Sequence, residues 1–462
     1  MHRKTVNLRC VINHMRVNTW ILTSQSLTIK RVETMTKPKK LMGVQQCLIS
    51  PDKKTQAVLE YICSESNKLH NCAVYYARQM WFKTRTFVTG FDLINEMRNS
   101  RNRHFSAFSA DAAAQTCLSV GESVKSFSEL LKKARKGELG QKPKFPNYRK
   151  PGYQLVAFSK RELKLIDGTI RFPLGLQVKA WFGLKEFFLP MPSNLDFAAI
   201  REVRILPRNG CFYAEYVYPV TAIKTEVEPA KCLGLDHGLN NWLTGISNVS
   251  TSFVIDGKHL KSVNQWYNKS VARLMKGKAN GFWSKRLANL TEKRNRRMRD
   301  AVNKTARIVV NHCLENKIGT VVFGWNKGQK NSANMGKKTN QKFVQIPTAR
   351  LKERIKQLCE IHGIQFVETE EAYTSKASFL DADSLPKHGE KPEKWKASGR
   401  RVKRGLYSSA NGFRINADCN GAANILRKVA MMLGLDLSGI SRGDLTAPLK
   451  FRFWTLQESP RL

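Results

Sequence analysis

The segment RINADCNGAANILRKVA (residues 414–430) places an acid, Asp418, where a short apolar entry meets the start of an amphipathic helix. Small residues open this helix, and Asn420 follows the acid within the first turn. Far upstream, KCLGLDHGLNNWLTGIS (residues 231–247) ends a short apolar run at Asp236, and another apolar run follows at once. Two acids at the ends of apolar elements indicate a site assembled from distant pieces of one chain.

The composition of the chain limits the kinds of partner that it can bind. Its 462 residues suffice for two or three domains, and they carry 79 Lys and Arg against 36 Asp and Glu, a formal net charge of +43. Such an excess opposes compaction by self-repulsion, so we expect a polyanionic partner that neutralises it, namely nucleic acid. No run of 18 apolar residues occurs, so a membrane is not expected as a partner.

The ten cysteines are scattered singly along the chain. Because none forms a CxxC pair, the spacing of a zinc ribbon is absent, and a disulfide framework is not expected in a chain of this length. We therefore expect reduced and mostly buried thiols in a cytoplasmic protein.

The first 40 residues hold nine Lys or Arg against one acid, Glu33, and show no clear period. They lack the apolar stretch and the small-residue cleavage site of a signal peptide. We expect residues 1–40 to be a disordered basic extension, or the result of translation from an upstream start, with Met35 or Met42 as the more natural beginning.

The next part of the chain has helical patterns. A strand is predicted at 44–49, and helices are predicted at about 55–82 and 110–132, the second of which ends in a basic turn and a glycine. The segment QKPKFPNYRKPG (residues 141–152) is too rich in proline for a helix. It predicts an extended basic linker, which either contacts nucleic acid or is simply solvated.

Residues 152–220 carry two hairpin signals. Asp167-Gly168 and Asn209-Gly210 each lie between runs of alternating apolar residues. Such dipeptides suit the tight turns of antiparallel hairpins. We therefore predict a small antiparallel barrel or sandwich in this region.

From residue 230 onward, strands alternate with helices. Strands are predicted near 231–236, 242–247 and 252–256, followed by a long helical stretch over about 262–316. One face of this stretch carries cations: Lys285, Arg286, Lys293, Arg294, Arg296, Arg297, Arg299, Lys304 and Arg307. Because charges of one sign repel each other along a helix, we expect this face to contact phosphates, with Arg286, Arg294 and Arg297 as candidates.

Three further elements are predicted after this stretch. They are a buried strand IGTVVFG (residues 318–324), a helix near 348–362 and a strand GIQFVETEE (residues 363–371). An RNase H-like fold has this order of elements: three strands with a helix, then a strand, a helix and a further strand. The predicted fold is therefore α/β in its C-terminal part, preceded by helical and β-barrel parts.

The acids suit the hydrolysis of a phosphodiester. In-line attack needs charge stabilisation on both the attacking and the leaving oxygen, which two Mg²⁺ ions about 4 Å apart provide through carboxylate ligands. Asp236 and Asp418 supply two such ligands. The place for a third, at the end of residues 318–324, holds Gly324, so the candidates are Glu368, Glu370 and Glu371 at the close of the later strand.

Several motifs resemble those of TnpB, the transposon-encoded RNA-guided endonucleases related to type V CRISPR effectors and to Fanzor proteins. The blocks that carry the resemblance are GLDHGLNNWLTG, EEAYTSKASFLDAD and RGLYSSANGFRINADCNGAANILRK, with KPKFPNYRKPGY and NMGKKTNQKFVQIP as further markers. The resemblance runs from about Met42 to Val429. It implies an RNA-guided DNA endonuclease; RNA guidance rests on this resemblance alone.

The resemblance also implies roles for the acids. Asp236 and Asp418 match the first and third acids of a RuvC-like nuclease domain, and the commoner second acid would follow the strand that here ends at Gly324. The chain is similar to the branch in which this glutamate precedes YTSK, which implies Glu371 as the third metal ligand and Glu370 as the fallback. Mg²⁺ or Mn²⁺ is the expected cofactor.

The zinc ribbon that commonly follows TSK in the family is missing. Residues 377–403 fill that interval with Asp381, Asp383, Glu390 and Glu393 but without cysteine, so zinc is not expected.

The domain organisation follows the same resemblance. Residues 56–135 resemble a recognition lobe, and residues 41–55 with 136–229 resemble a split wedge barrel. Residues 230–432 would form the RuvC-like domain, with 262–316 as a basic helical insertion, and 433–462 a C-terminal tail. The implied partners are a guide RNA from the transposon end and double-stranded target DNA beside a short adjacent motif. The implied location is the prokaryotic cytoplasm, with the nucleoid.

Two further residues are candidates for contacts with nucleic acid. Arg404 would contact a phosphate, and Asn420 would orient Asp418 or the scissile strand, unless it caps or packs the last helix. Two other functions compete with the nuclease. One is a decayed relative that binds guide RNA and DNA without cutting, which Gly324 favours, and the other is an accessory transposase.

Overall fold

The computed structural model describes residues 41–326 and 346–452. The extension predicted over residues 1–40 and most of the NMGKKTNQKFVQIP segment lie outside the described residues. No helix within the described ranges is long and apolar enough to span a membrane.

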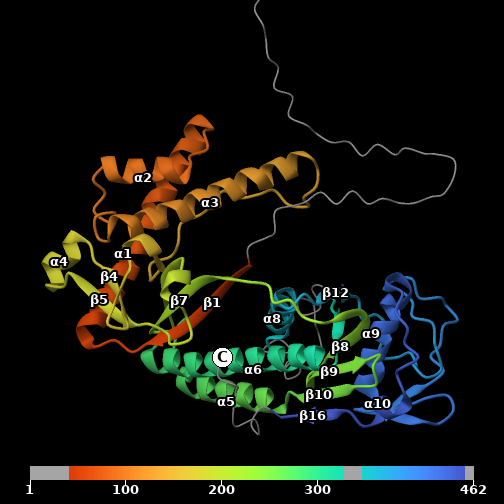
Figure 1. Ribbon diagram of the computed structural model, residues 1–462. Helices are drawn as coiled ribbons and strands as arrows, with labels where there is room; N and C mark the ends of the chain where they lie inside the picture. The colour runs from red at the N-terminus through yellow and green to blue at the C-terminus, as the bar shows by residue number, and fades with distance from the viewer. Residues whose placement is uncertain (1–40, 327–345, 453–462) are drawn as a thin grey trace, which may run out of the picture. The chain divides into compact units, whose positions relative to one another are not determined.

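The helices and strands before residue 221 are coloured from red to yellow-green in Figure 1. The helices are α1 (Lys53–Thr84), α2 (Gly90–Asn99), α3 (Ala110–Arg135) and α4 (Leu176–Phe182). The strands are β1 (Leu41–Ile49), β2 (Val156–Ser159), β3 (Lys164–Ile166), β4 (Thr169–Pro173), β5 (Glu186–Pro190), β6 (Glu202–Arg208) and β7 (Cys211–Val220).

These strands form two antiparallel sheets, with the orders β1-β7-β6-β2 and β3-β4-β5. Strand β1 pairs with β7 along its whole length, from Leu41 opposite Val220 to Ile49 opposite Phe212. Both predicted hairpins are present, because Asp167-Gly168 joins β3 to β4 and Asn209-Gly210 joins β6 to β7, all four residues having positive φ. The sheets share one apolar core with α1, α2 and α3.

The second half of the described chain contains a larger sheet and its helices. The strands are β8 (Glu228–His237), β9 (Asn241–Ser247), β10 (Ser252–Asp256), β11 (Ile318–Gly324), β12 (Gln365–Thr369), β13 (Arg400–Lys403), β14 (Leu406–Ser408), β15 (Arg414–Asn416) and β16 (Leu449–Phe451). The helices are α5 (Lys258–Met275), α6 (Lys285–Glu315), α8 (Thr348–Ile361), α9 (Ala417–Leu433) and α10 (Arg442–Thr446).

The large sheet has the order β12-β11-β8-β9-β10-β16. Strands β8, β9 and β10 are antiparallel neighbours, whereas β11 runs parallel to β8 and β12 parallel to β11. The predicted succession of three strands with a helix, a strand, a helix and a strand is therefore observed. Because residues 449–451 pair with β10, part of the segment predicted as a C-terminal tail belongs to this sheet.

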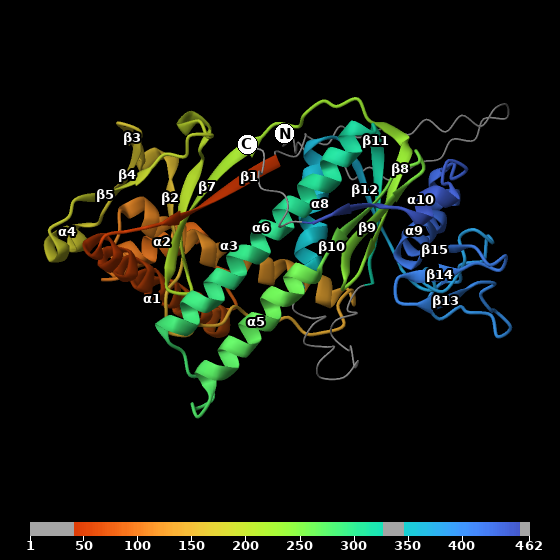
Figure 2. The ribbon, with the colours of Figure 1, turned by 90° about the horizontal axis from the view of Figure 1, so that it is seen from below.

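Helices cover both faces of the large sheet (Figure 2). On one face, Leu233 and Leu235 of β8 pack in one core with α6 and α8. On the other face, Cys232 and Val322 pack with Ala422 of α9. Strands buried on both faces read as nearly continuous apolar runs, which is the pattern of IGTVVFG in β11.

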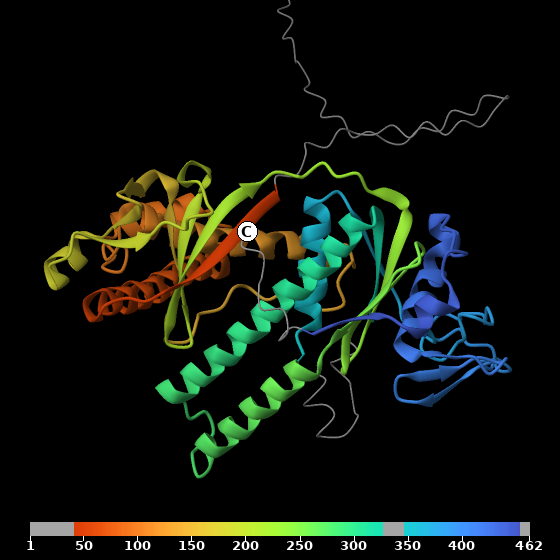
Figure 3. The ribbon, with the colours of Figure 1, turned by 60° about the horizontal axis from the view of Figure 1, so that its bottom comes forward.

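The helical stretch predicted over residues 262–316 is two helices, α5 and α6, which lie side by side in Figures 2 and 3. The intervening segment contains Gly277 and Gly281, both with positive φ, which lets the chain reverse between the helices. Trp283, which lies within the predicted helical stretch, precedes α6 and is exposed.

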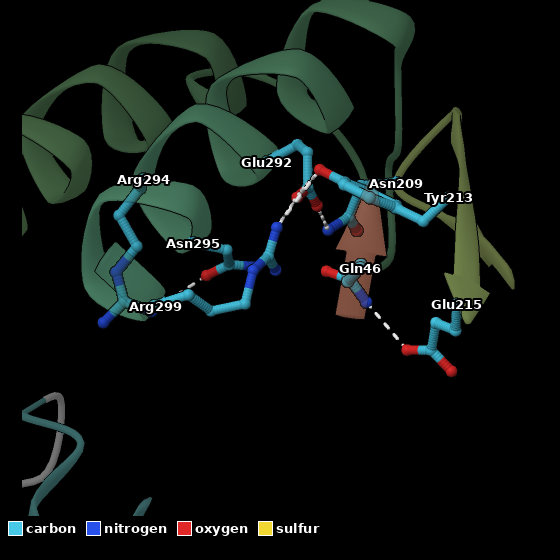
Figure 4. A network of polar contacts seen from close by, with 8 residues as sticks. All are labelled: Gln46, Asn209, Tyr213, Glu215, Glu292, Arg294, Asn295 and Arg299. Atoms are coloured by element: carbon cyan, nitrogen blue, oxygen red, sulfur yellow. Dashed lines mark hydrogen bonds and ion pairs between the residues drawn. The ribbon is translucent and has the colours of Figure 1, made fainter. Parts of the chain in front are cut away.

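A buried carboxylate links α6 to the β6–β7 hairpin (Figure 4). Glu292 of α6 is fully buried and accepts hydrogen bonds from Tyr213 Oη at 2.5 Å, Arg299 Nη2 at 2.6 Å and Asn209 Nδ2 at 2.8 Å. Burial alone raises the pKa of Glu292, but these hydrogen bonds and the charge of Arg299 outweigh burial and lower its pKa. The hairpin and the helix are thus joined by a fully satisfied ionic contact.

We expect Glu292→Ala to lower the free energy of unfolding by about 3 kcal/mol, because it removes the buried carboxylate that accepts from Arg299, Tyr213 and Asn209. Urea denaturation of the full chain measures this change. The matched control is Asp300→Ala, which removes an exposed ion pair with Lys304 on the same helix and should cost less than about 1 kcal/mol. Equal losses in the two variants would contradict the structural role of Glu292.

Candidate functional site

Asp236, Glu371 and Asp418 line one cavity of about 710 Å³. Asp236 lies at the carboxyl end of β8, Glu371 follows β12, and Asp418 lies in the first turn of α9. Because β8, β11 and β12 are parallel, their carboxyl ends meet at one edge of the sheet. The fold thus brings together three acids from distant parts of the chain.

The three carboxylates act on one another electrostatically. Burial, the charge of Glu371 and the charge of Asp418 raise the pKa of Asp236 well above its ordinary value. Burial raises the pKa of Glu371 to about 7. Such neighbours repel one another when ionised, and a bound cation offsets that repulsion.

The donor chemistry of this set fits a hard divalent cation, because all three side chains supply carboxylate oxygens. Glu371 Oε1 lies 3.4 Å from His237 Nε2, and among the described residues it accepts no hydrogen bond. In the same ranges, however, no three His, Cys, Asp or Glu side chains are grouped tightly enough to hold an ion as they stand. The set therefore fits a metal by its chemistry, whereas its spacing is wider than that of a closed ligand group.

Gly324 leaves the room that the Glu371 side chain occupies. A Cβ atom at position 324 would lie 2.8 Å from both Cγ and Oε1 of Glu371, and 2.5 Å from Cδ1 of Ile425. Gly421 of α9 likewise leaves room for the side chain of Asp236, because a Cβ atom at position 421 would lie 2.8 Å from Asp236 Oδ2. An acid at 324 and the observed position of Glu371 therefore exclude each other.

Asp418 is held by two residues that the sequence reasoning missed. Asn241 Nδ2 donates to Asp418 Oδ2 at 2.7 Å, and Arg401 Nη2 donates to Asp418 Oδ1 at 3.0 Å. Asn416 caps α9 by accepting from the backbone N–H of Asp418, at the helix end that favours negative charge. The available signal was position alone, since Asn241 follows Asp236 in GLDHGLNN and Arg401 precedes RGLY.

The other two candidate glutamates, Glu368 within β12 and Glu370 after it, have different partners. Glu370 accepts from Lys428 Nζ at 2.5 Å and from the backbone N–H of His388 at 3.2 Å. Glu368 pairs with Lys352 at 2.8 Å. Neither lines the cavity of Asp236 and Asp418, so the geometry favours Glu371 over the fallback Glu370.

Asn420 does not reach the cavity. It is fully buried, its Nδ2 donates to the carbonyl of Ala377 at 2.8 Å, and its Oδ1 accepts from the N–H of Phe379 at 2.9 Å. The neighbouring Asn424 also donates to Ala377. Asn420 therefore fastens the segment after YTSK to α9, which corrects its suggested contact with nucleic acid in favour of the packing alternative.

The basic candidates differ in how free they are to contact a ligand. Arg404 is exposed and lines the cavity. On α6, Arg286 and Arg297 are exposed, and Arg297 lies over the ring of Trp266. Arg294 instead is half-buried and donates to Asn264 of α5 at 2.9 Å, so it also joins the two helices.

Two aspartates organise the segment over residues 377–403. Asp383 accepts from the N–H of Ser378 at 2.7 Å and from Ser398 Oγ at 2.6 Å. Asp381 accepts from the N–H of Ala410 at 2.8 Å. These bonds tie residues 378, 398 and 410 together.

The raised pKa of Glu371 predicts an unusual pH dependence of stability. Between its ordinary pKa of 4.5 and its folded value of about 7, the folded state binds more protons than the unfolded state. The free energy of unfolding should therefore fall as pH rises through this window, by about 2 kcal/mol between pH 5 and pH 7 if Glu371 acts alone. Urea denaturation without divalent cations at pH 5 and pH 7 measures this fall.

Glu371→Gln is the control for this measurement, because it removes the titrating group. A fall of the same size in Glu371→Gln would show that other groups cause it, and would contradict the prediction.

Comparisons with known proteins bear on both fold and family. Residues 215–329 match the family OrfB_IS605, described as probable transposase, and residues 349–425 match the Cas12f1-like, TNB domain. No curated protein matches the chain.

Among solved structures, the chain is similar to a Cas12f1–sgRNA–target DNA complex, at 15% identity and a TM-score of 0.52, over 81% of this chain and 83% of that chain. It is also matched, at 10% identity and a TM-score of 0.41, to the mini-RNA-guided endonuclease CRISPR-Cas_phi3, over 87% of this chain and 94% of that chain. The class is thus a mixed α/β fold similar to that of Cas12f1. The family matches confirm the TnpB resemblance carried by the sequence motifs.

Proposed function

We propose that the chain is an RNA-guided, Mg²⁺-dependent DNA endonuclease of a transposon. The observation that carries this proposal is the meeting of Asp236, Glu371 and Asp418 in one cavity at the carboxyl edge of the large sheet. The sheet order and the helices on both faces support an RNase H-like RuvC domain over residues 230–432. Helices α1 to α3 would form the recognition lobe, and the two smaller sheets the wedge.

The three carboxylates would hold two Mg²⁺ ions, or Mn²⁺, through oxygen ligands. When bound, such ions stabilise the charge on the attacking and leaving oxygens of a phosphodiester. Asn241 and Arg401 position the carboxylate of Asp418 through its two oxygens. Arg404, exposed in the lining of the same cavity, would bind a phosphate of the DNA strand.

The partners are proposed from charge and from the relatives. A net charge of +43 favours polyanions, and the Cas12f1 relative was solved with sgRNA and target DNA. We propose a guide RNA that pairs with the target, with the protein reading backbone shape and a short adjacent motif in the DNA. Two exposed arginines of α6, Arg286 and Arg297, would contact the phosphate backbone.

A plasmid-cleavage assay tests this function. The full chain is purified with RNA co-expressed from the transposon end, and a plasmid library with randomised sequence beside the target is added with Mg²⁺, with Mn²⁺ or with EDTA. We expect cleavage that depends on the guide, on one adjacent motif and on the divalent cation. Absence of a guide-dependent cut on every library member would contradict the nuclease.

A non-cutting binder is the second candidate, and one observation favours it. Within the described residues, the three carboxylates are not grouped as a closed metal-ligand set. The same assay separates the two functions, because a decayed relative would retain the plasmid in a guide-dependent complex without cutting it.

A further inference from the structure

A cluster of aromatic rings lines a second cavity, far from the three carboxylates in the sequence. Trp81 stacks on Phe87 with ring centroids 4.3 Å apart and lies nearly parallel to Phe145 at 6.2 Å. Phe82 contacts Phe145 at 5.9 Å, and Phe127 contacts it at 5.0 Å. Trp81 and Phe82 at the end of α1, Phe127 of α3 and Phe145 of the linker after α3 line a cavity of about 550 Å³, and Phe87, from the segment between α1 and α2, packs on Trp81 outside that lining.

The linker is the segment KPKFPNYRK that the sequence analysis left open between solvation and a nucleic-acid contact. It is bound along α1 by its backbone. Arg78 donates to the carbonyl of Pro146 at 3.1 Å, and Asn71 both donates to the carbonyl of Arg149 and accepts from its N–H. Because this extended segment is held in place, the cavity it borders is preformed, and the linker is not merely solvated.

Cations surround the rings. Arg78 lies 5.1 Å from the ring centroid of Phe82 and 5.4 Å from that of Tyr148, and Arg85 lies 5.6 Å from that of Trp81. Lys142 and Lys144 of the linker line the cavity and are exposed. No acid is present among the described residues that line it.

Part of the aromatic surface faces outward. Phe82, which lines the cavity, is 52% exposed, whereas Phe127 and Phe145 in the same lining are buried. Beside the lining, Phe87 is 39% exposed and Tyr148, which shares Arg78 with Phe82, is 44% exposed. Exposed rings on a buried aromatic base, bordered by Arg and Lys, are the arrangement on which nucleobases stack while the cations hold the neighbouring phosphates.

We infer that this cavity is a stacking site for unpaired nucleotides of a single-stranded RNA segment, with Phe82 as the ring on which a base stacks. The charge favours a polyanion over a peptide, since four cations and no acid line the cavity. A paired strand keeps its bases stacked within the duplex, whereas RNA loops and ends offer bases that aromatic side chains can bind.

The inference deepens the proposed RNA-guided function but does not depend on cutting. RNA binding at this cavity needs neither Mg²⁺ nor the carboxylates. An inactive nuclease that still binds RNA here leaves the inference intact, and an active nuclease that binds no RNA here overturns only the inference.

Photochemical crosslinking locates the site. The full chain, freed of RNA in high salt, is mixed with a uridine oligomer carrying 5-iodouridine, irradiated, digested and analysed by mass spectrometry. We expect crosslinks at Phe82 and Tyr148 and in the peptide that contains Lys144. Crosslinks confined to peptides outside residues 78–87 and 142–148 would overturn the inference.

Substitutions test the stacking itself. We expect Phe82→Leu, which keeps an apolar side chain but loses the ring, to weaken binding of the oligomer about tenfold, and Phe82→Tyr to bind like the unmodified chain. The matched control is Phe91→Leu, which changes a 70% exposed phenylalanine outside the cavity. Equal affinities for Phe82→Leu and Phe91→Leu would overturn the inference, as would a deoxyuridine oligomer or a paired RNA that binds more tightly than the single-stranded RNA.

Lys144→Gln separates the charge from the ring. Loss of one phosphate contact should lower the slope of log affinity against log salt by about 0.7, without changing the crosslink at Phe82. An unchanged slope would contradict the role of Lys144 at this site.

Discussion

Glu371→Gln is expected to lower the rate of guide-dependent cleavage by about a thousandfold or more. The substitution keeps the size of the side chain but removes one of the three carboxylates that line the cavity with Asp236 and Asp418. A catalytic metal ion supplies several kcal/mol of charge stabilisation, and each loss of about 1.4 kcal/mol costs a factor of ten in rate. The initial rate of plasmid cleavage by the purified RNA complex measures the effect.

The structure offers a neighbouring residue as the control. Glu370→Gln removes the adjacent acid, which pairs with Lys428 and accepts from His388 outside the cavity. It should leave the cleavage rate within about threefold, because no cavity carboxylate is lost. Full activity in Glu371→Gln, together with loss in Glu370→Gln, would reverse the assignment.

Stability distinguishes a lost ligand from a damaged fold. Because burial raises the pKa of Glu371 to about 7, its ionised form opposes folding at higher pH. Glu371→Gln should therefore leave the metal-free chain at least as stable at pH 8 while cleavage is lost. A variant that loses both cleavage and stability would point to misfolding.

The sequence predicted elements best where one local rule applies. Asp167-Gly168 and Asn209-Gly210 supply the positive φ that tight hairpins need, and both turns are present. The strands predicted at 242–247 and 252–256 are observed as Asn241–Ser247 and Ser252–Asp256. Buried strands there are bounded by polar residues, so their limits are visible in the sequence.

Contacts between distant segments could not be predicted in this way. Asn241 and Arg401 are 160 residues apart in the sequence, and the fold brings both to the carboxylate of Asp418. Asn420 follows Asp418 by only two residues, but side chains two apart on a helix do not face the same way, and Asn420 is buried in the core. Gly324 in the sequence indicated a missing acid, and the structure shows which side chain lies in its place.

Gly324 provides the second prediction with a large effect. Gly324→Ala should lower cleavage about a hundredfold, because the added Cβ would lie 2.8 Å from Cγ and Oε1 of Glu371 and must displace that carboxylate. The matched control is Ala417→Gly, which removes a methyl group from a residue lining the same cavity and leaves Glu371 in place. Unchanged cleavage in Gly324→Ala would show that Glu371 does not need this space.

A combined variant tests whether the two positions are alternatives for one acid. Gly324→Glu alone should be inactive, because the new side chain meets both Glu371 and Cδ1 of Ile425, the latter at 2.5 Å. Adding Glu371→Gly removes the first obstacle, and Ile425→Val removes the second, at a cost of about 1 kcal/mol in stability. The triple variant carries one acid at the end of β11 instead of one after β12, so its cleavage should exceed that of Gly324→Glu and that of Glu371→Gly. If the triple variant cuts no faster than either, a carboxylate at position 324 cannot replace Glu371. Cleavage would then require the acid to be at position 371, and not only a carboxylate somewhere in the cavity.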